Sequence, residues 1–191
     1  GFGVIRVDEQ RRVRAFEEKP ARPDPLPGRP GVVLASMGIY VFNASFLVDE
    51  LIRDARDPDS THDFGRDLIP HVVARQPVHA HRFEDSCVRP PGARPYWRDV
   101  GTVDSYWEAN LDLTQILPEL GLYDEHWPIL SLQRQLPPAK FVFDDLGRRG
   151  MAVDSLVSSG CIVSGATVRR SILFSKVRVG ERSLVEESVV L

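Results

Sequence analysis

Hydrophobic and polar positions roughly alternate through the first twenty residues. Val4 and Val13 mark the two alternating runs, and the polar residues 8–10 lie between them. A period of two is typical of β-strands, and a short polar stretch between two such runs indicates a turn. Residues 3–20 are therefore predicted to form a β-hairpin.

The next part of the chain changes its pattern three times. Proline and glycine crowd residues 21–31, which predicts an exposed loop. An apolar, β-prone run follows from Ser36 to Phe42. Ser45 is a candidate N-cap for a helix from Phe46 to Ala55, in which apolar residues recur at helical spacing.

Residues 60–100 are predicted to mix short elements. Residues 60–74 have the pattern of a short capped helix that Pro70 interrupts, and residues 78–83 have that of a strand. A second loop rich in proline and glycine, residues 87–95, leads to an Arg-Asp pair at the end of a further predicted strand.

A helix and a long irregular passage come next. Thr102 is a candidate N-cap for a helix over residues 103–117. A loop-rich passage follows, in which two prolines precede an extended run at residues 136–143. Trp97 and Trp107 are predicted to be core residues rather than platforms for a ligand.

The last forty residues have a six-residue period. Leu156, Ile162 and Val168 keep this interval, and a neighbouring phase keeps it six times in succession: Cys161, Thr167, Leu173, Val179, Val185 and Leu191. A period of six suits a parallel β-helix in which each repeat forms one face of the coil. An ordinary valine-rich sheet is the alternative, and the number of consecutive repeats favours the β-helix.

Composition and charge narrow the class of protein. The chain has 191 residues, of which 42% are hydrophobic and 27% charged, as in a globular protein of one or two domains. A net charge of -3 gives no electrostatic case for nucleic acid or an anionic membrane. Two cysteines predict neither a disulfide framework nor a zinc site, and no apolar run is long enough to span a bilayer. We therefore expect a cytoplasmic protein.

Two short motifs carry candidate chemistry. FEEKP, residues 16–20, is either a solvated strand end and turn or a binding site for an anionic, hydroxyl-rich ligand. PYWRDVGT, residues 95–102, places Asp99 at a strand end, where α/β folds bind ligands and where a carboxylate can hold Mg²⁺. Pairing of Asp99 with Arg98, or capping of the next helix, is the local alternative.

Two other motifs have plainer explanations. The triplet DFG at residues 63–65 occurs in protein kinases, but the chain has no other kinase motif. Asp63 near a helix start and Gly65 for backbone freedom are enough to explain the triplet. His79 and His81 can point the same way and pair on a metal. No third ligand lies at a recognisable spacing, which favours a solvent-facing pair.

The motifs together resemble one family. In chain order they are FGVIRVDE, FEEKP, LASMGIYVF, HDFGRDLIP, PYWRDVGT, LPPAKFVF and the six-residue repeat. This combination resembles the ADP-glucose pyrophosphorylases, which are the glucose-1-phosphate adenylyltransferases of bacterial glycogen synthesis. The resemblance implies an α/β fold: the C-terminal part of a Rossmann-like nucleotidyltransferase domain (residues 1–118), an interdomain linker (residues 119–150) and the first coils of a left-handed parallel β-helix (residues 151–191).

The resemblance also implies roles for five residues. Gly3, Glu18, Lys19 and Ser36 match contacts of the family to glucose 1-phosphate. Lys19 and Asp99 match its catalytic residues, and Asp99 matches the aspartate that holds Mg²⁺. ATP would be the second substrate, and the family implies a homotetramer with an effector site near the β-helix.

The chain departs from the family pattern in one large respect. The glycine-rich nucleotide-binding loop and a second metal-binding aspartate are absent, so we expect a fragment of a longer polypeptide that does not catalyse alone. A nucleotidyltransferase that uses UTP, dTTP or GTP and a non-catalytic regulatory subunit stay open as alternatives. An acyltransferase is excluded because residues 150–191 contain no histidine.

Overall fold

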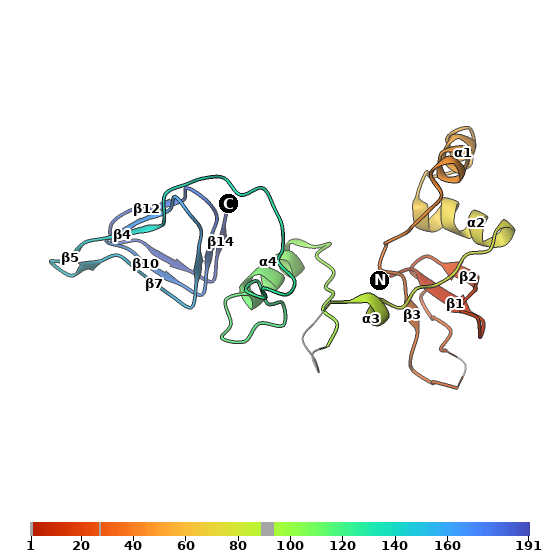
Figure 1. The fold of residues 1–191 in the computed structure, drawn as a ribbon, viewed down its shortest axis with the longest axis horizontal. Helices are drawn as coiled ribbons and strands as arrows, with labels where there is room; N and C mark the ends of the chain where they lie inside the picture. Colours follow the sequence, from red (N-terminus) through yellow and green to blue (C-terminus); the bar gives the residue numbers. More distant parts are fainter. Residues whose placement is uncertain (1, 27, 89–93) are drawn as a thin grey trace. The chain divides into compact units, whose positions relative to one another are not determined.

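The computed structural model describes residues 2–26, 28–88 and 94–191. It divides into two compact units, Gly1–Asp85 and Ser86–Leu191, and each is described here by itself (Figure 1). Pro27 of the first predicted loop and residues 89–93 of the second lie outside the described residues.

The first unit is built on a small antiparallel sheet. Its strands are β1 (Val4–Val7), β2 (Val13–Glu17) and β3 (Leu34–Ala35), in the order β2-β1-β3. The hairpin predicted over residues 3–20 is confirmed, because β1 and β2 pair from Val4↔Glu17 to Val7↔Val13. The carboxyl end of β2 therefore leads directly into Glu18 and Lys19.

Helical segments follow, and the two between residues 64 and 75 pack against β2. The segments are α1 (Ala44–Ala55), the π-helix η1 (Phe64–Leu68), α2 (Ile69–Arg75) and the short α3 (Phe83–Ser86). Leu68, Ile69 and Val72 are buried together with Val13 and Phe16 of β2. The predicted interruption at Pro70 is wrong: the helical run continues from η1 through α2, and Pro70 lies in the first turn of α2, where a proline is tolerated.

The N-cap predicted for α1 is wrong by two residues. The helix begins at Ala44, and Asn43 is its cap, with Oδ1 accepting a hydrogen bond of 3.1 Å from the backbone N–H of Ser45. Asparagine is at least as good a cap as serine, and the backbone of Asn43 is extended, as capping requires. The hydroxyl of Ser45 also donates to Asn43 Oδ1, at 2.7 Å.

Three segments predicted as strands form little or no strand. Residues 36–42 contain no strand, because β3 ends just before them at Ala35. The last hydrogen bond of its ladder runs from Ser36 N–H to Gly3 O. Residues 78–83 contribute a single bridge, Arg12↔His79, and residues 94–102 contain no strand. The β-propensity of a segment describes its fit to a neighbouring strand, and where no partner continues the ladder the propensity is not realised.

The second unit begins with a capped helix, α4 (Val103–Asp112). Thr102 is its N-cap, as predicted, and forms a reciprocal capping box with Ser105. The helix ends five residues before the predicted Leu117, because the N–H groups of residues 113–115 bond three residues back and tighten the chain ahead of Pro118.

The predicted core position of two tryptophans is wrong. Trp97 and Trp107 are each 39% exposed. Trp107 lies on α4 and donates its indole N–H to the backbone carbonyl of Glu187, at 2.8 Å. Its ring therefore covers a coil corner from outside instead of filling a core.

Three parallel sheets confirm the predicted β-helix. Their orders are β13-β10-β7, β14-β11-β8 and β12-β9-β4, and Figure 1 shows them as the sides of a triangular coil. The strands are β4 (Lys140–Val142), β7 (Met151–Val153), β8 (Leu156–Val157), β9 (Ile162–Ser164), β10 (Thr167–Arg169), β11 (Ile172–Leu173), β12 (Arg178–Val179), β13 (Leu184–Glu186) and β14 (Val189–Val190). A hairpin of β5 (Asp144–Asp145) and β6 (Arg148–Arg149) stands between β4 and β7.

The coils are shorter than a strict six-residue repeat requires. Thr167 pairs with Met151, 16 residues earlier, and with Leu184, 17 residues later. A repeat of six on three faces would need about 18 residues per coil. The positions that point inward therefore shift relative to the six-residue repeat read from the sequence. Val163 and Val168 are fully buried, whereas Leu191, a member of the repeat, is 80% exposed.

Candidate functional site

The carboxylate of Glu18 lies in a narrow space beside two glycines. An ideal Cβ on Gly3 would lie 3.0 Å from Glu18 Oε2, and one on Gly65 would lie 2.3 Å from the same oxygen. The other carboxylate oxygen, Oε1, lies 3.5 Å from the ammonium of Lys19. The Glu18 side chain is 21% exposed, so it is held against the protein but can still reach a ligand.

Lys19 follows Glu18 with an unusual backbone. Its φ is 48°, in the left-handed region that a lysine rarely adopts. Strain of this kind persists only where the surrounding structure imposes it, and it is frequent at binding sites. The Lys19 side chain is 65% exposed, so its ammonium is available to an anion from solvent.

Ser36 is tied to the same place by its backbone. Its N–H donates to the carbonyl of Gly3 at 2.7 Å, at the edge where β3 leaves the sheet. Its hydroxyl lies 3.0 Å from the hydroxyl of Tyr40 and accepts from the N–H of Gly38. The structure thus brings together the four predicted residues of the first unit: Gly3, Glu18, Lys19 and Ser36.

Gly65 is a residue of this site that sequence reasoning missed. Asp63 lies at the start of a helix, as predicted, and the structure shows that it is the N-cap of η1: its Oδ1 accepts from the N–H groups of Gly65 and Arg66 at 2.8 and 2.9 Å. The backbone freedom predicted for Gly65 is wrong, because its φ is not positive. The glycine is needed for space beside Glu18, and only the HDFG motif itself signalled that the position is special.

Two aspartates brace the loop that carries Gly65. Asp54 on α1 is 7% exposed; it accepts from Ser60 Oγ at 2.8 Å and lies 2.9 Å from His62 Nδ1. The bond to His62 first, and then that to Ser60, hold the pKa of Asp54 below its usual value. Asp67 accepts from Thr61 Oγ1, and this bond is the main reason that its pKa is lowered as well.

Asp99 belongs to the second unit and is described only within it. It is exposed, and its Oδ1 accepts from the N–H of Gly101 at 3.2 Å. The guanidinium of Arg98 contacts Glu108 and Asp112 on α4. Arg98 thus pairs with residues of α4 instead of Asp99, and Thr102 instead of Asp99 caps that helix. The carboxylate of Asp99 faces solvent.

The described residues contain single carboxylates that could bind a metal ion, but no complete set of metal ligands. No group of three or more histidine, cysteine, aspartate or glutamate side chains in this part of the chain could hold an ion. Mg²⁺ is typically bound by one or two carboxylates, with waters and phosphate oxygens completing its shell, so Asp99 suits it. His79 and His81 are both exposed, as the solvent-facing prediction requires.

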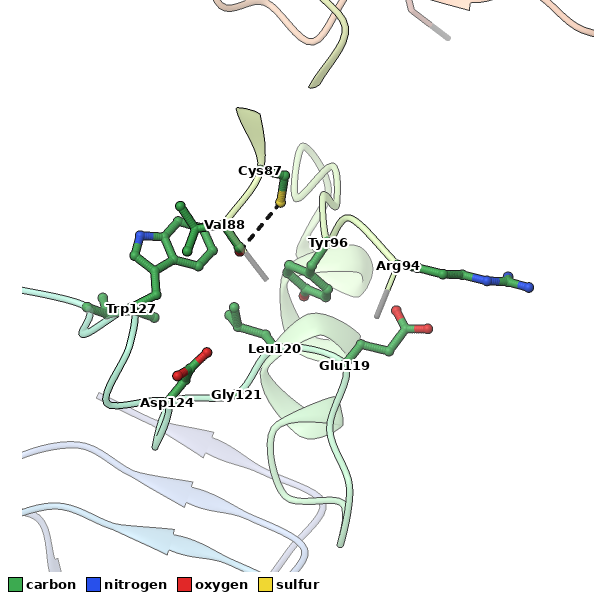
Figure 2. Close-up of a pocket in the computed structure, with 10 residues that line it drawn as sticks. Cys87, Val88, Arg94, Tyr96, Glu119, Leu120, Gly121, Asp124 and Trp127 are labelled. Carbon is green, nitrogen blue, oxygen red and sulfur yellow. Dashed lines mark hydrogen bonds between the residues drawn. The ribbon is translucent and has the colours of Figure 1, made fainter. Parts of the chain in front are cut away.

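A small pocket in the second unit is lined by none of the predicted site residues. Its volume is about 40 Å³. Figure 2 shows Tyr96, Leu120 and Trp127 around it, with Cys87 donating weakly to the carbonyl of Val88. A volume of this size holds about one water molecule, whereas small-molecule sites typically measure roughly 300 Å³ or more. Among the described residues, this pocket is therefore too small to enclose a sugar phosphate.

Comparisons with known proteins find relatives of both parts of the chain. A family model described as "Nucleotidyl transferase" matches residues 1–116, and one described as "GlmU-like, C-terminal hexapeptide" matches residues 137–191. Curated relatives named "Glucose-1-phosphate adenylyltransferase" are 64% identical in Nitrosospira multiformis, 63% in Methylobacillus flagellatus and 61% in Nitrosomonas europaea. Each alignment covers 100% of this chain, which spans 44–45% of the length of these relatives.

Proposed function

Because this chain belongs to the nucleotidyl transferase family, we propose that it is part of an enzyme that makes ADP-glucose. In the proposed reaction, α-D-glucose 1-phosphate reacts with ATP and pyrophosphate is released. The name of the relatives, glucose-1-phosphate adenylyltransferase, supports transfer of an adenylyl group to glucose 1-phosphate. The observation that carries the proposal is the carboxylate of Glu18 beside the ammonium of Lys19, next to Gly3 and Ser36. The activity belongs to the complete protein.

The two charged residues suit the two halves of a sugar phosphate. The carboxylate of Glu18 accepts hydrogen bonds from glucose hydroxyls, and the ammonium of Lys19 binds the phosphate oxygens. Gly3 lets the backbone approach the sugar, and the Ser36 hydroxyl both donates and accepts. Each of these residues lies directly before β1 or directly after β2 or β3 in the chain.

The chemistry is an in-line displacement at phosphorus. An oxygen of the sugar phosphate attacks the α-phosphorus of ATP, and the bond from that phosphorus to the departing pyrophosphate breaks. Lys19 orients the attacking phosphate. Enzymes of this kind generally use a divalent metal, and we propose Mg²⁺ held by Asp99, which supplies charge neutralisation at the phosphates when bound.

The organisation of the complete protein is also a proposal. We propose a cytoplasmic homotetramer, with catalytic residues over 1–118, a linker from residue 119 and β-helix coils over 151–191. Within the range first expected for the linker, 119–150, β4 already pairs with β9 and belongs to the β-helix. In the described parts of the chain, no helix is long and apolar enough to cross a membrane. Analytical ultracentrifugation of the complete protein tests the tetramer, and a monomer at micromolar concentration contradicts it.

The first test is nucleotide preference. The complete protein is supplied with glucose 1-phosphate and Mg²⁺, and pyrophosphate release is compared for ATP, UTP, dTTP and GTP. A strong preference for ATP supports the proposal. Preference for another nucleotide moves the enzyme to a sister group, and no release with any of them favours the alternative of a regulatory subunit.

A further inference from the structure

Gly65 occupies a position where a side chain and the observed Glu18 exclude each other. An ideal Cβ at Gly65 would lie 2.3 Å from Glu18 Oε2 and 2.8 Å from Glu18 Cδ. Separations below 3.0 Å are essentially never seen for real Cβ atoms, so one of the two residues would have to move. We propose that Gly65 is a positioning residue that sets where the Glu18 carboxylate lies; this inference rests on the proposed function.

The loop is the side that resists movement. Asp63 Oδ1 accepts from Gly65 N–H, and Asp67 Oδ2 accepts from the N–H groups of Thr61 and Asp63 at 3.1 and 3.0 Å. Immediately after this turn, Leu68 is 2% exposed and packed in the core. The backbone at Gly65 is therefore held on both sides.

Glu18 is the side that yields. Its carboxylate is the end of a flexible side chain, which can rotate to another rotamer at low cost. Rotation would take Oε2 out of the space between Gly3 and Gly65 and would separate Oε1 from the Lys19 ammonium. A residue larger than glycine at position 65 would thus disturb sugar recognition while the fold stays intact.

Other glycines give the contrast that makes this inference specific. A Cβ on Gly3 would lie 2.5 Å from the ring carbon Cζ of Phe16, which is 8% exposed, so a substitution there disturbs the core. A Cβ on Gly150 would meet the backbone carbonyls of Val142 and Val163, both at 2.5 Å. Gly180 has no atom within 4 Å of such a Cβ and no positive φ, which makes it a neutral control.

The experiment is a double-mutant cycle in the complete protein. The variants are Gly65→Ala, Glu18→Ala, their combination, and Gly180→Ala as the matched control. The KM values for glucose 1-phosphate and ATP are measured by pyrophosphate release. The Kd for glucose 1-phosphate is measured by calorimetry, and the Tm of each variant is recorded.

Gly65→Ala is expected to raise both the KM and the Kd for glucose 1-phosphate by roughly ten- to a hundredfold, as for the loss of hydrogen bonds to a charged group. The KM for ATP and the Tm should stay at their wild-type values. In the Glu18→Ala background the clash is gone, so adding Gly65→Ala should cause little further loss. Gly180→Ala should behave as the wild type.

The possible failures are distinguishable. A wild-type protein that releases no pyrophosphate from glucose 1-phosphate with any nucleotide removes the proposed function, and this inference with it. An active wild type with an unaffected Gly65→Ala variant removes the inference alone. The same holds if Gly65→Ala lowers the Tm by many degrees, or weakens binding equally in both backgrounds, because Gly65 would then act through the fold.

Discussion

Lys19 combines a strained backbone with an accessible charge. Its φ of 48° turns the chain sharply after β2, and its ammonium stays close to Glu18 Oε1. The turn thus places one hydrogen-bond acceptor and one cation side by side, as the proposed sugar-phosphate site requires. A sugar phosphate carries both complementary groups, which a nucleotide base or an apolar ligand does not.

Replacement of Lys19 by alanine tests whether its ammonium binds the phosphate of the sugar phosphate. Lys19→Ala should raise the apparent KM for glucose 1-phosphate by roughly tenfold or more, because a charge-assisted bond to phosphate is lost. The KM for ATP should change much less, and Lys140→Ala, an exposed lysine of β4, serves as the control. Equal changes in both KM values would take Lys19 out of the sugar-phosphate site.

Asp99 is expected to act on the rate rather than on binding. Asp99→Asn should lower kcat by roughly a hundredfold, the size typical for the loss of one charge-stabilising group in a transition state. The Mg²⁺ concentration that gives half-maximal rate should rise. Asp104→Asn, an exposed aspartate in the first turn of α4, is the matched control. A near-normal rate at ordinary Mg²⁺ would return Asp99 to a structural role.

At the scale of elements, local signals predicted local structure. The hairpin, the helix start at Asp63 and the Thr102 cap all depend on residues a few positions apart, and all three are confirmed. The strands expected over residues 36–42 and 78–83 depend on partners elsewhere in the chain, and they fail for that reason.

The site follows the same rule. Glu18 and Lys19 are neighbours in one motif, so the sequence could single them out together. The contact of Gly65 with Glu18 joins η1 to the end of β2, and no local pattern in the sequence encodes it. The exclusion of a side chain becomes visible only when both elements are in place.

The loop from Ser60 to Asp67 should respond to acid. The pKa values of Asp54 and Asp67 lie below their usual 3.8 in the folded protein. A carboxyl group with a depressed pKa stabilises the fold at neutral pH, and this contribution is lost as the pH falls below about 4. The loop should therefore loosen in that range, before the β-helix does.

Hydrogen exchange measures this loosening. The amides of Thr61 and Asp63, which donate to Asp67, should lose protection as the pH falls through about 4, after correction for intrinsic exchange rates. Asp67→Asn should weaken protection already at neutral pH, whereas Asp49→Asn on the exposed face of α1 should not. Protection that is independent of pH in the wild type would contradict the prediction.

At the scale of the whole molecule, the β-helix has the most continuous core. Cys161, Val163, Val168 and Leu173 are each 0% exposed, and the last three come from the successive strands β9, β10 and β11. A six-residue period predicted this architecture but could not predict which phase points inward. The true coils of 16 and 17 residues shift the phase by one or two positions per turn.

Leu173 lies in the core of the coil, and Leu184 lies on its surface. Leu173→Ala should destabilise the protein by about 2–5 kcal/mol, the range for a buried leucine that leaves a cavity. Leu184→Ala should cost less than about 1 kcal/mol, because Leu184 is 61% exposed. Urea unfolding followed by circular dichroism measures both, and equal losses would show that burial does not decide the difference.

The unequal coils differ at one corner. Between β9 and β10 the chain turns through Gly165 and Ala166, whereas between β12 and β13 it turns through residues 180–183. The paired strands keep their register on either side, so the longer turn absorbs the extra length. Over evolutionary time, insertions and deletions between homologous genes should therefore accumulate at such corners, while the faces of the coil keep a constant length.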